Sequence, residues 1–133
     1  MGKVMTDNVT VIRYNDRLKE TDERLRQLLE RYERISINDS NLWATMALPH
    51  ARHLKNMMEL ARVITLGALN RNESRGAHYK PDFPNRDDAN FLKTTIAEHS
   101  GEGPVLSYDP VDVSLIKPRK RDYSHEKKET AKA

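Results

Sequence analysis

The sequence contains no cysteine, few glycines and no long apolar run. Without cysteine, the 133 residues cannot form disulfides, use thiolate chemistry or ligate metal clusters through sulfur. The five glycines never form the Gly-x-Gly-x-x-Gly pattern that cradles a dinucleotide pyrophosphate. No apolar run approaches the roughly 20 residues of a membrane-spanning helix, and the N-terminus has no apolar signal core. We therefore expect a soluble chain without direct membrane insertion or dinucleotide binding of its own.

The sequence also lacks a large excess of charge of either sign. Lysine and arginine number 23 and aspartate and glutamate 20, which gives a formal net charge of +3 at pH 7. Most of the excess lies near the C-terminus, so the composition does not support nucleic-acid binding over a whole face. With 37% hydrophobic residues, the chain is expected to form one small domain or a piece that buries part of its surface against something larger.

Apolar residues at three- and four-residue steps predict a first amphipathic helix from Asn15 to Ile35. Either Asn15 or Asp16 can cap its start. Acidic residues four positions before arginines, such as Asp22 before Arg26, favour ion pairs along its outer face. These charges are typical of a solvated face.

A second, longer helix is expected to begin a few residues before Pro49, which is tolerated only in the first turns, and to run to about Asn72. Trp43, which precedes it, is expected to plug the end of the bundle. From 61 to 69 the helix is apolar nearly all round, and such a helix is covered on more than one side. Where this chain offers no cover, we expect partial exposure of Val63, Leu66 and Leu69.

Two other segments carry β-branched residues. Val9-Thr10-Val11-Ile12 has the composition of a strand, whereas the spacing of Met5, Val9 and Ile12 fits one helical face. A helix is favoured here because a lone strand would have no partner. Further along, the segments 91–98 and 105–115 flank turn residues and predict a β-hairpin.

Polar and ionisable side chains are densest between Asn70 and Pro84, around Gly76, a residue that can adopt positive φ. One interpretation is structural: Asn72 and Gly76 cap the long helix while an arginine meets its last carbonyls. The other is functional: Arg75 and His78 donate hydrogen bonds to an anion or a carboxylate. Composition does not separate the two.

The remaining polar groups point to ordinary structural roles. His50 and His53 have the spacing of a partial metal pair, but no third ligand recurs on that face. Asp87 and Asp88 are more typical of the cap of a short helical turn than of an acid/base dyad. The basic segment 117–133 reads as a solvated, partly disordered tail.

Six runs along the chain form a recognisable set: Met-Thr-Asp-Asn-Val-Thr-Val at 5–11, Leu-Ala-Arg-Val-Ile at 60–64, Asn-Arg-Asn-Glu-Ser-Arg-Gly-Ala-His-Tyr-Lys-Pro-Asp-Phe-Pro at 70–84, Arg-Asp-Asp at 86–88, Phe-Leu-Lys-Thr-Thr at 91–95 and Pro-Arg-Lys-Arg-Asp-Tyr at 118–123. Together they resemble the C-terminal domain of the flavoprotein subunit of succinate dehydrogenase and fumarate reductase, closest to the succinate dehydrogenase of low-GC Gram-positive bacteria. L-aspartate oxidase shares a related, shorter motif.

The resemblance implies a mainly α fold: a three-helix, spectrin-repeat-like bundle followed by an extended loop and a small β-hairpin. It implies that Met1 to Arg13 is helical. The expected division is a bundle at 1–72, a motif loop plus β-hairpin of the same domain at 73–116, and the basic tail at 117–133.

The resemblance also implies a parent enzyme, an FAD-dependent succinate dehydrogenase that oxidises succinate to fumarate and passes electrons to an iron-sulfur subunit. This fragment is expected to be inactive alone and to dock against the FAD and capping domains of its parent, in the cytoplasm at the inner face of the cell membrane. No catalytic, cofactor-binding or metal residue is assigned to it. The expected docking residues form the motif loop: Glu73, Ser74, Arg75, Gly76, His78 and Tyr79.

Two alternatives remain open. The chain can be a stand-alone helical interaction module whose polar loop binds an acidic protein or a phosphate, an interpretation supported by its basic tail. It can also be the same domain of a fumarate reductase or of an L-aspartate oxidase.

Overall fold

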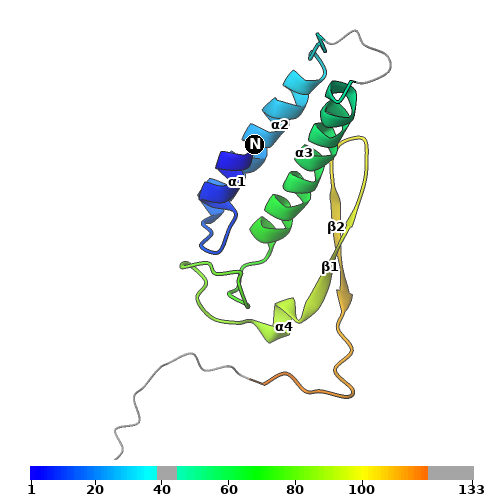
Figure 1. Cartoon of the computed structure of the whole chain (residues 1–133). Coiled ribbons are helices and arrows are strands. Elements are labelled where there is room, and N and C mark those ends of the chain that lie inside the picture. Colours follow the sequence, from blue (N-terminus) through cyan, green and yellow to red (C-terminus); the bar gives the residue numbers. More distant parts are fainter. Residues whose placement is uncertain (39–44, 120–133) are drawn as a thin grey trace, which may run out of the picture.

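The computed structural model describes residues 1–38 and 45–119, and its elements are four helices and one hairpin (Figure 1). A mainly α fold with a small β-hairpin is therefore confirmed. Trp43 and the tail residues 120–133 lie outside the described residues. The elements in chain order are α1 (Gly2–Asn8), α2 (Asn15–Tyr32), α3 (Ala47–Asn70), α4 (Asp88–Phe91), β1 (Lys93–Glu98) and β2 (Val105–Pro110).

Helices α2 and α3 run antiparallel and form the body of the domain (Figure 1). Helix α2 buries Leu18, Thr21 and Leu25, the stripe that its apolar spacing predicts. Helix α3 meets it with mostly small side chains, which allow a close approach of the two backbones. The buried residues of α3 are Met58, Ala61, Thr65 and Ala68.

The first segment is helical only in part, so the expectation of a helix from Met1 to Arg13 is wrong beyond Asn8. Helix α1 packs on α2, and Val9, buried at its end, joins the core with Leu18 and Ala68. The following backbone is extended, since Ile12 forms a parallel bridge with Tyr79. The partner that the β-branched run lacked nearby lies in the distant loop.

The helix boundaries differ from the predictions by a few residues. Helix α3 begins two residues before Pro49, as expected, and ends at Asn70. Neither Asn15 nor Asp16 is the N-cap of α2. The N-cap is Tyr14, which makes no side-chain hydrogen bond, and the side-chain amide of Asn15 instead donates to the side-chain oxygen of Asn72. Asp22 accepts from Arg62 of α3 and not from Arg26, which turns an expected surface pair into a link between helices.

The hairpin lies alongside α3 (Figure 1) and pairs antiparallel from Lys93 opposite Pro110 to Glu98 opposite Val105. It ends at Pro110, earlier than the predicted Leu115. Gly103, in the turn between the strands, has φ +127° and lies against the Arg62 guanidinium. A lone two-stranded hairpin is marginally stable, so such contacts with the helices matter.

One side of α3 is not covered by the rest of the described chain. Val63, Leu66 and Leu69 are half-buried, as expected from the all-round apolar sequence. Met57, Leu60 and Ile64 are still more exposed, with 50%, 62% and 53% of their surface accessible. Within residues 1–38 and 45–119, no helix combines the length and apolarity needed to cross a membrane.

Candidate functional site

The motif loop, together with its flanking residues from 71 to 88, crosses the end of the helix pair and leads into α4 and the hairpin (Figure 1). Its centre is Glu73, whose side chain is fully buried. Glu73 accepts hydrogen bonds from Arg71 at 2.6 Å, from Arg75 at 2.8 and 2.9 Å, and from the Asp87 amide at 2.9 Å. On the functional interpretation Arg75 donates to an anion or a carboxylate, and the buried carboxylate that it contacts belongs to its own loop.

These donors decide the charge state of Glu73. Burial alone would raise the pKa of its carboxyl, because an apolar surrounding disfavours the charged form. The hydrogen bonds from Arg75, the Asp87 amide and Arg71 outweigh burial and hold the pKa of Glu73 below its usual value. Glu73 is therefore ionised at neutral pH and serves as the counter-ion around which the loop folds.

Arg75 continues the charge network outward. Its guanidinium also donates to Asp88 at 2.6 Å, and Asp88 in turn accepts from Arg86 at 2.7 Å. The hydrogen bond to Glu73 raises the pKa of Arg75 against the opposing effect of burial. Acid and base alternate from the buried Glu73 to the surface, so the loop carries little unbalanced charge.

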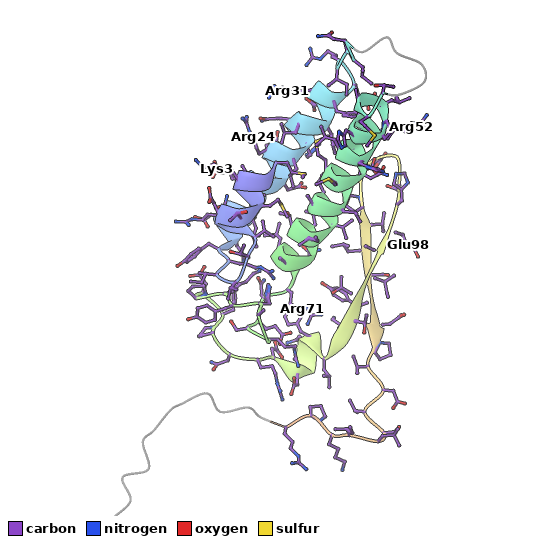
Figure 2. The ribbon with its side chains drawn as sticks, viewed as in Figure 1. Lys3, Arg24, Arg31, Arg52, Arg71 and Glu98 are labelled. Carbon is purple, nitrogen blue, oxygen red and sulfur yellow. The ribbon has the colours of Figure 1, made fainter. Side chains whose placement is uncertain are left out.

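Arg71 joins the loop to the base of the hairpin (Figure 2). Besides Glu73, it donates to the carbonyls of Phe91 and Lys93, both at 2.8 Å, and to the Thr95 hydroxyl at 3.3 Å. Its guanidinium also lies 5.6 Å from the centre of the Phe91 ring. One side chain at the end of α3 therefore positions α4 and β1.

Ser74 and Gly76 shape the backbone of the loop. The Ser74 hydroxyl donates to the Phe83 carbonyl at 2.8 Å and accepts from the Lys80 amide at 3.0 Å. Arg75 and His78 exchange two backbone hydrogen bonds around Gly76, which has φ +59°. A residue with a Cβ is disfavoured at that φ, so glycine is required for this turn and not for the end of α3.

His78 is held in one tautomer. Its Nδ1 faces the Arg13 guanidinium at 2.5 Å, and its Nε2 lies 3.0 Å from the Arg71 carbonyl. Because a guanidinium only donates, Nδ1 accepts and Nε2 carries the proton that it donates to the carbonyl. Burial lowers the pKa of His78, and this effect outweighs the opposing effect of the hydrogen bond to the Arg71 carbonyl. The ring is therefore neutral at pH 7.

Lys80 closes the end of the helix pair, although it was not among the predicted site residues. It is only 1% exposed, and its Nζ donates to the Leu69 carbonyl, Asn15 and Asn72 at 3.0, 2.6 and 3.1 Å. The capping charge at the C-terminus of α3 therefore comes from Lys80, and not from an arginine as one interpretation expected. Burial lowers the pKa of Lys80 to about 8.

Part of the exposed surface at the loop is apolar. Tyr79 is 40% exposed and lies beside Val11 and Ile12, which are 52% and 53% exposed. Two hydrogen bonds fix this arrangement: the Tyr79 amide donates to the Val11 carbonyl, and the Arg13 amide donates to the Tyr79 carbonyl. Tyr79 of the loop, together with Val11 and Ile12 of the segment after α1, thus presents one aromatic and two aliphatic side chains at the end of the bundle.

The described residues of the motif loop do not fit a flavin site. Arg71, Arg75 and Arg86 each contact a carboxylate of the loop, His78 uses both ring nitrogens, and Lys80 is buried. No cation of residues 71–88 is left to hold a pyrophosphate. Residues 1–38 and 45–119 also contain no cluster of three or more His, Asp or Glu side chains that could bind a metal.

Other sequence expectations fare unevenly. Asp87 caps α4 by accepting from the Asn90 amide, as predicted, whereas Asp88 serves the charge network. His50 and His53 are exposed on α3. Arg13 was missed because it lies far upstream of the loop, and no local pattern signals its contact with His78.

Comparison with known proteins matches nearly the whole chain to one family. The family described as fumarate reductase flavoprotein C-term matches residues 1–123. The succinate dehydrogenase flavoprotein subunit of Bacillus subtilis (strain 168) is 56% identical over 129 residues, which cover 96% of this chain and 22% of the relative. The fumarate reductase flavoprotein subunit of Haemophilus influenzae is 33% identical over 127 residues, or 95% and 21%.

Solved structures show the same fold. A chain of the E. coli quinol fumarate reductase has a TM-score of 0.85 and 30% identity, covering 90% of this chain and 21% of that chain. Sdh1 of Mycobacterium smegmatis has a TM-score of 0.69 and 25% identity, covering 84% and 19%. The fold and its charged loop define the C-terminal domain of a flavoprotein subunit. The chain belongs to the succinate dehydrogenase and fumarate reductase flavoprotein C-terminal family, and it spans about a fifth of the length of these relatives.

Proposed function

We propose that this domain belongs to a succinate dehydrogenase, whose complete flavoprotein oxidises succinate to fumarate with FAD and passes electrons to an iron-sulfur subunit. The observation that carries the proposal is the 56% identity to the B. subtilis succinate dehydrogenase flavoprotein, compared with 33% to the H. influenzae fumarate reductase. The complex would hold the domain at the cytoplasmic face of the cell membrane without inserting it. FAD and the reacting groups lie in other domains, so this chain alone is inactive.

We propose a docking role for the domain itself. It comprises the bundle at 1–72, the motif loop and hairpin at 73–116 and the basic tail at 117–133, and it packs against the FAD and capping domains of the parent. Four residues of the motif loop, Glu73, Ser74, Arg75 and His78, fix the loop through contacts inside the domain. Gly76 and Tyr79 lie on its exposed side and face the parent.

The same domain in a fumarate reductase is the second candidate. The TM-score of 0.85 to the E. coli quinol fumarate reductase supports it. The two candidates differ in the favoured direction of the reaction, which depends on parts of the parent outside this chain.

A chimera tests the proposal. In the B. subtilis flavoprotein, the matching 129-residue section is replaced by this chain. We expect the chimera to bind FAD and to reduce a dye with succinate. The control is the same flavoprotein truncated before the section. A chimera no better than the truncated control would contradict the proposal.

The isolated chain provides a second measurement. Titration with FAD and with succinate in a calorimeter should give no binding heat, and the chain should not reduce a dye. Tight flavin binding or turnover by the 133 residues alone would overturn the assignment of the chemistry to other domains.

A further inference from the structure

Helix α3 has a second apolar face. Unlike the buried stripe that contacts α2, this face is exposed. Met57, Leu60 and Ile64 follow one another at steps of three and four residues, so they share one side of the helix. Between half and two thirds of each side chain is exposed. A surface helix normally buries one stripe and exposes polar residues elsewhere, so this face is unusual for a helix in water.

Gly67 is the next position on the same face, three residues after Ile64. Inside a helix, glycine lowers stability more than any other residue except proline, because its backbone gains the most freedom on unfolding. Among residues 1–38 and 45–119 nothing calls for it: a Cβ added at Gly67 would meet no described atom within 4 Å, and its φ is not positive. A glycine on an apolar helical face allows another backbone to approach closely.

A hollow continues the same surface toward the hairpin. Leu60 and Val63 help to line a groove of about 710 Å³ between α3 and residues 97–104 of the hairpin. The opposite wall includes the turn that contains Gly103. The exposed face of α3 is therefore bordered by a recess that can receive side chains of an occupant.

We propose that the face formed by Met57, Leu60, Ile64 and Gly67 seats a helix of the parent flavoprotein chain that lies outside these residues. The alternation of three- and four-residue steps is the pattern by which one helix packs on another. Gly67 marks the point of closest approach between the two backbones. This inference rests on the proposed function, since it requires a longer parent.

The size of the face favours a covalently linked occupant. Three half-exposed aliphatic side chains offer roughly a few hundred Å² at most, against ~800 Å² per partner in a typical stable complex. A segment of the same polypeptide needs less area, because its effective concentration is high. About four fifths of the length of the matched relatives lies outside this chain, so such a segment is available.

Gly67→Ala gives the sharpest test, because the two contexts predict opposite signs. In the isolated 133-residue chain, the added methyl group meets no atom and removes the cost of glycine, so Tm should rise by about 2 to 5 °C. In the chimera described above, the same methyl group enters a close helix contact, so Tm should fall by several degrees. Gly67→Leu should enlarge the fall in the chimera.

Gly2→Ala is the matched control. Gly2 is the first residue of α1, away from the α3 face and its groove, and a Cβ there also meets no atom within 4 Å, without a positive φ. It should shift Tm by the same small amount in both contexts. Equal shifts for Gly67→Ala in both contexts would overturn the inference, and so would a fall already present in the isolated chain.

A crosslinking experiment identifies the occupant. A photoreactive benzoylphenylalanine at position 60 of the active chimera should crosslink within the same polypeptide, to a helix upstream of the replaced section. The same probe at Lys19, an exposed position on α2, serves as the control. Crosslinks from position 60 to the iron-sulfur subunit or to a second copy would contradict the assignment. A chimera that never becomes active contradicts the proposed function itself, whereas an active chimera with indifferent Gly67 variants rejects only the α3 face.

Discussion

The Arg62 guanidinium binds Asp22 across the α2–α3 interface, with Nε 2.8 Å from Oδ1, and Gly103 of the hairpin turn covers it. The two side chains are only 13% and 15% exposed. One largely buried ion pair thus lies where two helices and the hairpin meet. Such a pair is less screened by water than a surface pair, and its loss leaves a charge without a partner.

Arg62→Ala should therefore destabilise the isolated chain by roughly 2 kcal/mol, because the largely buried Asp22 would lose its counter-ion. Urea unfolding followed by circular dichroism measures the change. The control is Lys55→Ala, which removes an exposed pair with Glu33 and should cost less than about 1 kcal/mol. Equal costs for both variants would show that the Arg62 pair has no special weight.

Glu73→Gln should destabilise the chain by about 3 kcal/mol at pH 7, because Arg71 and Arg75 lose the charge that both of them bind. The pH dependence has a definite sign. The pKa of Glu73 is below its usual 4.5 in the folded chain, so its contribution is full above that value and is lost as the pH falls toward the folded pKa.

The measurement for Glu73 is the free energy of unfolding from pH 7 down to pH 3. The difference between the original chain and Glu73→Gln should shrink as the pH falls below about 4.5. Glu30→Gln, at an exposed position of α2, controls for the general effect of acid. A difference that does not depend on pH would refute the role of the ionised carboxylate.

Because folding lowers the pKa of Lys80, the free energy of unfolding of the domain should increase as the pH rises through the alkaline range. Its pKa is about 8 in the folded chain, against 10.5 for an exposed lysine. The unfolded chain therefore binds more protons between these two values, and the free energy of unfolding rises with pH there. The full rise is roughly 3 kcal/mol at ~1.4 kcal/mol for each pH unit between the two pKa values.

Lys80→Met removes this titration. From pH 8 to 10.5, the original chain should gain stability relative to Lys80→Met, as measured by urea unfolding at each pH. Lys3→Met, at an exposed position of α1, should track the original chain over the same range. Parallel curves for the original chain and Lys80→Met would mean that Lys80 titrates at its ordinary pKa in the folded domain.

The sequence predicted the parts of this fold that depend on local periodicity. The helix containing Leu18 and Leu25 and the hairpin starting near Lys93 follow patterns that neighbouring residues complete. The bridge between Ile12 and Tyr79 could not be predicted, because the two residues are distant in sequence and neither has a local pairing signal. The β-branched composition of the first segment was informative, but its partner was out of view.

The density of polar and ionisable residues in the sequence pointed to this loop, whereas the role of each residue within the loop could not be predicted. Arginine, histidine and glutamate in one loop indicate an ionic network, but the same composition suits an external anion. The deciding fact is the burial of Glu73, which depends on how the loop closes over the ends of α2 and α3. Lys80 was passed over for a related reason, since a lysine is usually exposed and one of its three neutral acceptors, Asn15, lies far upstream.

Arg75→Ala in the active chimera should reduce activity and Tm more than His50→Ala does. Arg75 binds both Glu73 and Asp88, so among the described residues its removal leaves the buried carboxylate with Arg71 as its one side-chain donor and takes away one of the links between the loop and α4. A cost of about 2 to 4 kcal/mol follows from breaking a buried charge network. His50 is exposed on α3, where substitution costs within about 0.5 kcal/mol.

Two readouts separate the docking role of Arg75 from its role in folding. In the isolated chain, Arg75→Ala lowers Tm through the lost ion pairs alone. If the loop also docks on the FAD and capping domains, the chimera carrying Arg75→Ala loses bound FAD or dye reduction at temperatures where its domain is still folded. Arg75→Lys should restore part of the stability but not the two-sided contact, because an ammonium cannot span both carboxylates as a guanidinium does. Activity unchanged in both variants would leave the loop as a purely internal structure and reject its part in docking.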